Sequence, residues 1–149
     1  MIRILNMSLK YKFIILCFCV VLSCAQDKKE SQDSNTTESI ENTSWLVVNL
    51  KGETEFSRQP TIRIDLSGKG ISGSSGCNRY FGDVTINKNQ VKISNVGSTK
   101  MMCNNINTEQ LFFEALNEAT FFKAEGNTLK LMSKDKKVII ECSHLKEGN

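Results

Sequence analysis

Two stretches of the sequence are the most informative about its fold. The first reads Ser72-Gly73-Ser74-Ser75-Gly76-Cys77-Asn78-Arg79-Tyr80-Phe81-Gly82-Asp83, and the second reads Gly97-Ser98-Thr99-Lys100-Met101-Met102-Cys103. Three glycines in the first stretch predict a strand that is kinked or closely approached by other backbone. The cysteine of each stretch lies at one end of a hairpin-like segment, where a covalent link between them could form. We therefore expect these two stretches to meet in the folded domain.

The N-terminal residues 1–23 have the layout of a secretory signal peptide. Arg3, Lys10 and Lys12 occur without an acidic residue and precede the apolar run 13–22. That run has about ten residues, whereas a helix needs about twenty to cross a bilayer. A cleaved signal is therefore favoured over the alternative, an N-terminal anchor that stays on the protein.

The end of this segment, Val21-Leu22-Ser23-Cys24, resembles a bacterial lipobox. Cleavage at a lipobox leaves the cysteine, here Cys24, as the new N-terminus with a diacylglyceryl thioether and an N-acyl chain such as palmitate. Several acyl chains hold a protein firmly to a bilayer, at about 0.8 kcal/mol per buried methylene. The residue after the lipobox cysteine is Ala25 and not Asp, which resembles lipoproteins that are transported on to the outer membrane. We therefore expect a lipid anchor in the outer membrane, on its periplasmic or surface face.

The segment 24–42 is predicted to be the lipidated cysteine followed by a disordered linker. Between Ala25 and Asn42 the residues are almost all polar or charged, and Ala25 and Ile40 are the only apolar ones. A segment of this composition buries too little apolar surface to offset the conformational entropy that it would lose on folding. As a flexible coil it would span roughly 20–25 Å, enough to hold a domain away from the lipid headgroups.

The remaining residues, 43–145, have the size of one domain with one core. Residues 1–23 carry three basic residues and no acid, so their removal leaves 16 basic and 16 acidic residues. A neutral domain gives no reason to expect nucleic-acid binding.

Three cysteines remain in the domain: Cys77, Cys103 and Cys142. In an oxidising envelope compartment we favour a disulfide between Cys77 and Cys103, because both lie in the paired stretches. Three unpaired buried thiols are the alternative. A zinc set with His144 is also open, although no C-x-x-C pair supports it.

Alternating apolar residues and turn signals predict about seven to eight short strands. In the clearest strand, 60–66, Ile62 and Ile64 face one side and Arg63 and Asp65 the other. One helix is predicted from about Thr108 to Ala119, with Asn107 or Thr108 as its cap and one apolar stripe. The stripe residues are Phe112, Ala115, Leu116 and Ala119. This order predicts an α+β fold, mainly antiparallel β: a curled sheet or partly open barrel with one helix packed on it.

Nearly all of residues 43–142 resembles the META domain, also called HslJ-like. The resemblance is carried by Trp45, Gly73–Gly82, Ser98–Cys103, the helix residues Glu109, Phe112 and Leu116, and Gly126–Leu131. A Gly-Cys-Asn-Arg motif followed by Thr-x-Met-x-Cys is its specific part. One departure is the run Asn104-Asn105-Ile106-Asn107, where many members have a proline. The resemblance implies a β-rich envelope domain without an established catalytic activity or cofactor, tied to heat stress and to resistance toward novobiocin.

The sequence shows no nucleophile with a matching base, no pair of catalytic carboxylates and no metal-binding motif. Its one histidine, His144, lies near the C-terminal end, and Asp65 and Asp83 are read as solvated strand acids. We expect a monomeric, non-enzymatic envelope protein without metal or cofactor, which binds an unidentified protein or small molecule or has a structural role. A carrier of a small apolar ligand in the concave face of the sheet is the alternative.

The candidate binding residues are the polar side chains of the paired stretches: Asn78, Arg79, Thr99 and Lys100. The competing interpretation is structural. In it Asn78 and Thr99 satisfy buried backbone groups around the cysteine link, and Arg79 pairs with an acid. A concave, partly apolar pocket beside Asn78 and Thr99 would favour binding.

Overall fold

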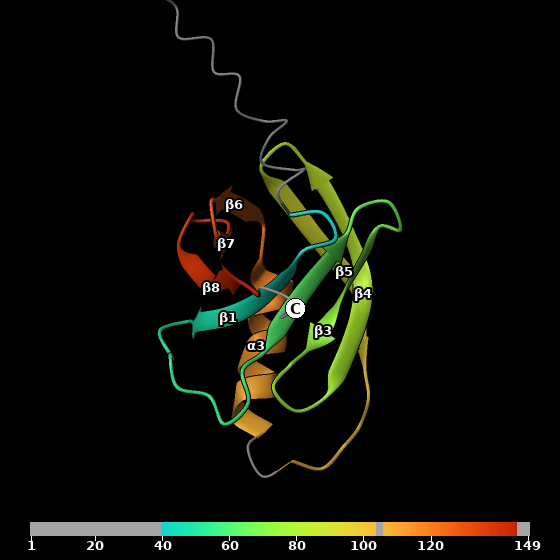
Figure 1. Ribbon diagram of the computed structural model, residues 1–149, viewed down its shortest axis with the longest axis vertical. Helices are drawn as coiled ribbons and strands as arrows, with labels where there is room; N and C mark the ends of the chain where they lie inside the picture. Colours follow the sequence, from blue (N-terminus) through green and yellow to red (C-terminus); the bar gives the residue numbers. More distant parts are fainter. Residues whose placement is uncertain (1–39, 104–105, 146–149) are drawn as a thin grey trace, which may run out of the picture. The chain divides into compact units, whose positions relative to one another are not determined.

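The computed structural model describes residues 40–103 and 106–145, which form eight strands and one helix (Figure 1). The strands are β1 (Ser44–Leu50), β2 (Thr61–Asp65), β3 (Gly70–Ser74), β4 (Arg79–Asn87), β5 (Gln90–Ser98), β6 (Phe121–Glu125), β7 (Thr128–Met132) and β8 (Val138–His144). The helix α3 (Ile106–Glu118) lies between β5 and β6 in the chain.

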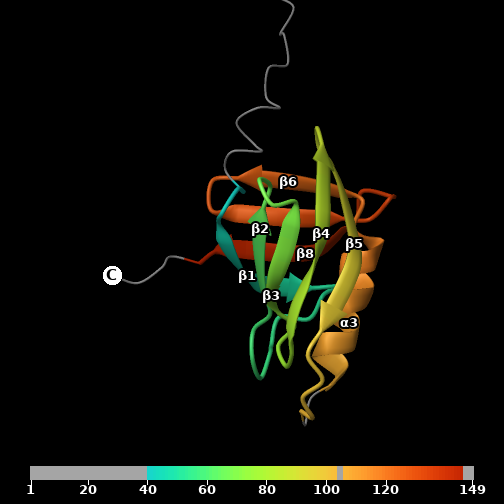
Figure 2. The ribbon, with the colours of Figure 1, turned by 90° about the vertical axis from the view of Figure 1, so that its right-hand side faces the viewer.

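The strands form one closed antiparallel barrel in sequence order. Each strand pairs with the next, and β8 returns to pair with β1. Figure 2 shows β6, β7 and β8 running across the direction of β4 and β5. The predicted α+β class is confirmed, and the barrel is closed rather than partly open.

The barrel closes between β5 and β6 through a narrow seam. The paired residues are Gln90 and Phe121, and the Val91 amide donates to the Thr120 carbonyl at 2.9 Å. Beyond this point β5 stays paired with β4 on one edge, while its other edge continues beside α3 (Figure 2). The helix thus covers the side of the barrel where the ladder ends.

The core fills the inside of the barrel with inward-facing strand residues. Ile62 and Ile64 are buried on β2, as their alternation predicts. On β1 a register shift between Val47 and Asn49 puts Leu50 inward, after Trp45 and Val47. Each large apolar side chain buried in this way contributes about 1.5–3 kcal/mol.

The helix packs against this core through the apolar stripe that the sequence predicts. Phe112, Ala115, Leu116 and Ala119 are all buried, which confirms the stripe. The helix begins at Ile106, earlier than predicted, so Asn107 and Thr108 lie inside its first turn rather than before it.

The folded domain begins earlier than residue 43, and the predicted linker 24–42 is too long at its C-terminal end. Ile40 is fully buried in the core, Glu41 forms a parallel bridge with Ile64, and the Asn42 amide donates to the Ile64 carbonyl at 2.8 Å. A single apolar residue in a polar segment has no periodicity to reveal it. Cys24 and its lipobox lie outside the described residues.

Candidate functional site

The loop between β3 and β4, residues 75–78, is closed on itself and needs glycine. The Ser75 amide donates to the Asn78 carbonyl at 2.8 Å. Gly76 has φ +93°, and a Cβ there would lie 2.9 Å from the Arg58 carbonyl oxygen. Backbone conformation and space both exclude a larger residue. We call residues 75–78 the signature loop.

A disulfide links this loop to the segment that follows β5. It joins Cys77 to Cys103, with Cα atoms 6.1 Å apart. This is the pairing that the sequence favoured. Cys142 keeps a free thiol, buried in the core, so the described cysteines do not gather into a zinc set with His144.

Asn78 is at the centre of a buried hydrogen-bond network rather than at a ligand site. Its Nδ2 donates to both oxygens of Glu109, at 2.9 and 3.1 Å. Its Oδ1 accepts from the Thr99 hydroxyl at 2.8 Å and from the Met101 amide at 2.7 Å. Only 4% of Asn78 is exposed. Its side chain thus ties together β4, the segment after β5 and α3.

Glu109 is the residue of this network whose role the sequence analysis missed. Its carboxylate also accepts from the Ser75 hydroxyl at 3.0 Å and from the Asn78 amide at 3.2 Å. Glu109 lies in the first turn of α3, where the helix dipole also favours a negative charge. The sequence marks Glu109 only as a helix residue of the family resemblance, and its contact with the loop could not be inferred because the two are 31 or more positions apart in the chain.

The other predicted site residues divide between structural and exposed positions. The Thr99 hydroxyl accepts from the Arg79 amide at 3.2 Å while donating to Asn78, so it joins β4 to the segment after β5. The Arg79 and Lys100 side chains are exposed, and neither forms an ion pair with another described residue. Asn78 and Thr99 therefore come together as the structural interpretation predicts, whereas Arg79 has no acidic partner among the described residues.

Arg79 lines a surface hollow on the outer face of β1 to β4. The hollow has a volume of about 320 Å³, and its lining includes Arg63, Ser72, Ser74, Arg79 and Tyr80. Neither Asn78 nor Thr99 lines it. We call it the arginine hollow, after the two arginines at its sides.

The floor of the arginine hollow is strand backbone brought together by Gly73. A Cβ at Gly73 would overlap the carbonyl oxygen of Thr61 on β2. Beneath the hollow the Tyr80 ring is buried, its hydroxyl donates to the same carbonyl at 3.1 Å, and burial raises the pKa of that hydroxyl. The floor is thus fixed by packing that admits no side chain at residue 73.

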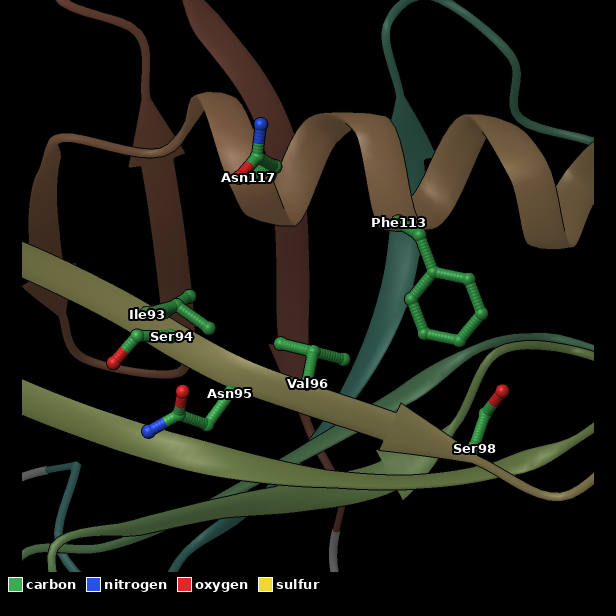
Figure 3. A pocket seen from close by; sticks show the side chains of 7 residues that line it. All are labelled: Ile93, Ser94, Asn95, Val96, Ser98, Phe113 and Asn117. Atoms are coloured by element: carbon green, nitrogen blue, oxygen red, sulfur yellow. The ribbon is translucent and has the colours of Figure 1, made fainter.

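A second cavity, the α3–β5 groove, lies between the helix and the part of β5 beyond the seam. It has about 310 Å³ and is lined by Ile93, Ser94, Asn95, Val96, Ser98, Phe113 and Asn117. In Figure 3 the ring of Phe113 extends from α3 toward β5, which carries Val96. The groove is where helix and strand adjoin without a backbone ladder.

The described residues with catalytic or metal-binding potential lie apart. Asp65 and Asp83 lie in one cross-strand row, separated by Gly70, and the Asp65 carboxylate accepts from Ser67 and Gly68, which lowers its pKa. The His144 ring packs edge-on against Trp45, with centroids 5.6 Å apart. In the described part of the chain no group of three or more His, Cys, Asp or Glu residues could hold a metal ion.

Comparison with solved structures finds the same fold in other proteins. An NMR structure of a protein from Burkholderia xenovorans matches with a TM-score of 0.59 and 19% identity, over 74% of this chain and 87% of that one. A second NMR structure matches with a TM-score of 0.58 and 24% identity, over 72% and 93%. A crystal structure of a DUF4847 family protein from Bacteroides vulgatus matches with a TM-score of 0.58 and 21% identity, over 75% and 99%. At these identities the likeness concerns the fold.

No curated protein matches the sequence. Within residues 40–103 and 106–145, no helix is long and apolar enough to cross a membrane. The family model of the META domain matches residues 38–143, a range that includes the buried Ile40 and ends within β8. The chain therefore belongs to the META domain family.

Proposed function

We propose that this chain is a lipid-anchored protein of the bacterial envelope whose META barrel is a non-enzymatic binding domain serving in envelope stress. The observation that carries the binding role is the position of Arg79. Asn78 and Thr99 are used to hold the signature loop, whereas the Arg79 side chain lines an open hollow. The binding surface is then the outer face of β1 to β4.

The lipid anchor rests on the sequence before the barrel. The basic N-terminus, the short apolar run and the lipobox ending at Cys24 support lipidation, and Ala25 supports transfer to the outer membrane. The polar segment between Cys24 and Ile40, where the described barrel begins, is the linker that would let a monomeric barrel stand off the bilayer.

The non-enzymatic role is supported by how the reactive side chains are used. His144 packs on Trp45, and the Cys142 thiol is buried in the core. Asp65 and Asp83 are about two strand spacings apart, roughly 10 Å between Cα atoms, too far for direct contact of short side chains. The alternative role, a carrier of an apolar ligand inside the barrel, gains no support, because core side chains occupy the inner face.

The anchor is tested by growing cells with an alkyne-bearing fatty acid and measuring the label and intact mass of the protein from membranes. We expect label on the native chain and none on Cys24→Ala, with Cys142→Ala as the matched cysteine control that keeps its label. After denaturation, one alkylatable thiol should become three on reduction. An unlabelled chain, or three free thiols before reduction, would contradict the envelope assignment.

A further inference from the structure

We propose that the arginine hollow is a binding site for a phosphate group, carried by a small organic molecule or by a lipid headgroup. This inference rests on the proposed binding function and names the chemistry of its ligand. The site is built from side chains of β1 to β4 that the barrel's register brings together.

The register places Arg63 and Arg79 on either side of two serines. Arg63 pairs with Ser72 across β2 and β3, and Ser74 pairs with Arg79 across β3 and β4. The Cα atoms of the two arginines are two strand spacings apart across the sheet and two residues apart along the strands, which gives a separation of about 12 Å. Both arginine side chains line the hollow. The small side chains between them leave room for a ligand.

The charge of the hollow is unbalanced. Two guanidinium groups line it, and its ten lining residues include no acid. On the same face, Asp65 is two residues from Arg63 along β2, but it does not line the hollow, and its Oδ1 accepts from the Ser67 hydroxyl at 2.6 Å and the Gly68 amide at 2.8 Å. A guanidinium presents a planar fork of donors that matches phosphate oxygens. The hollow is therefore suited to an anion with several oxygens.

The hydroxyl groups in the hollow are also available as donors. The oxygens of Thr61 and Ser74 accept from the amides of Ser74 and Gly76, at 3.0 and 3.2 Å, which leaves their hydroxyl hydrogens free to donate. The described contacts give the Ser72 hydroxyl no partner. Phosphate oxygens accept hydrogen bonds, so these hydroxyls complement the two arginines.

An exposed aromatic residue of β4 is the cross-strand neighbour of Ser72, although it does not itself line the hollow. Phe81 lies directly across from Ser72 in the β3–β4 register, and 65% of it is exposed. Its ring lies against Gly97 of β5, whose lack of a side chain leaves the ring room.

The test is a titration of the full chain in non-ionic detergent with inorganic phosphate and glycerol 3-phosphate, followed by the NMR signals of the arginine side chains. We expect saturable shifts of Arg63 and Arg79, with Arg58 unmoved. Arg63→Gln and Arg79→Gln should each weaken binding about tenfold, because each removes a charged hydrogen-bonding fork. Arg58→Gln removes the same charge from an exposed loop position outside the hollow, and should change binding less than about twofold.

Vesicles distinguish the two sources of phosphate. Vesicle binding is measured with the unlipidated chain, expressed without residues 1–24, so that acyl chains do not hold it to every bilayer. Binding of the free phosphates, or binding of this chain to phosphatidylglycerol but not phosphatidylcholine vesicles that is lost in Arg63→Gln and Arg79→Gln, would support the site and identify its ligand as free or as a headgroup. If the native chain binds none of these probes, or if Arg58→Gln weakens binding as much as the two hollow variants, the inference is overturned. The fatty-acid label on Cys24 is independent of this result, so failure of the site and failure of the anchor are told apart.

Discussion

The contact between Asn78 and Glu109 should be a main stabilising link between the signature loop and α3. Asn78→Ala removes a hydrogen bond to a carboxylate and two bonds to Oδ1, from Met101 and Thr99. At about 1.5–3 kcal/mol for the charged bond and 0.5–1.5 for each neutral one, the variant should lose about 3–5 kcal/mol of unfolding free energy.

A double-mutant cycle isolates the part of this loss that belongs to the pair. Glu109→Ala also loses its bonds to the Ser75 hydroxyl and the Asn78 amide, but these losses occur equally in the double variant and cancel. The coupling energy should be about 1.5–2 kcal/mol, at the lower end for a charged bond because Glu109 is only half buried.

The assay is urea unfolding of the native chain, the two single variants and the double variant, followed by Trp45 fluorescence. The matched control is the exposed ion pair of Lys123 and Glu125, 2.7 Å apart, whose coupling should be below about 0.5 kcal/mol. If the Asn78–Glu109 coupling is as small as that of the control pair, the network does not hold the loop to the helix, and the structural assignment of Asn78 is refuted.

Three further predictions concern the loop, the floor of the hollow and the core thiol. Replacing Cys77 and Cys103 together by serine should lower the unfolding free energy by about 3.5 kcal/mol, from the 26-residue separation, and a reductant should lower that of the native chain equally but leave the variant unchanged. Gly73→Ala should cost more than about 2 kcal/mol in thermal unfolding because its Cβ would overlap backbone, whereas Gly70→Ala, which meets nothing within 4 Å, should cost less than about 1 kcal/mol; equal losses would contradict the close approach. Burial, with a smaller contribution from the adjacent Glu141, raises the pKa of the Cys142 thiol above its ordinary value of 9.0. The folded state therefore keeps the thiol proton that the unfolded state loses, so stability should fall as pH rises above about 9, and Cys142→Ala should show less of this fall in urea unfolding.

Local sequence patterns are enough to predict the secondary-structure elements of this protein and their buried faces. The alternation of Ile62 and Ile64 fixes which face of β2 is inward, and the spacing of Phe112, Ala115 and Leu116 fixes the buried side of α3. Both are short-range periodicities set by backbone geometry, so they can be read without knowing any partner. The same reasoning placed the helix start two residues too late, at Thr108 instead of Ile106. It also placed the domain start too late, because Ile40 is buried next to Glu41, which bridges to Ile64 of the distant strand β2.

The roles of the polar residues Asn78 and Arg79 depend instead on contacts between distant parts of the chain. Asn78 and its neighbour Arg79 look alike in the sequence as polar members of one motif, but one is buried against a carboxylate 31 positions away and the other lies beside an open hollow. The approach of Arg63 to Arg79 likewise depends on the registers of three strands. Register and barrel closure are set by the packing of the whole core, and no local pattern specifies which distant side chains they bring together.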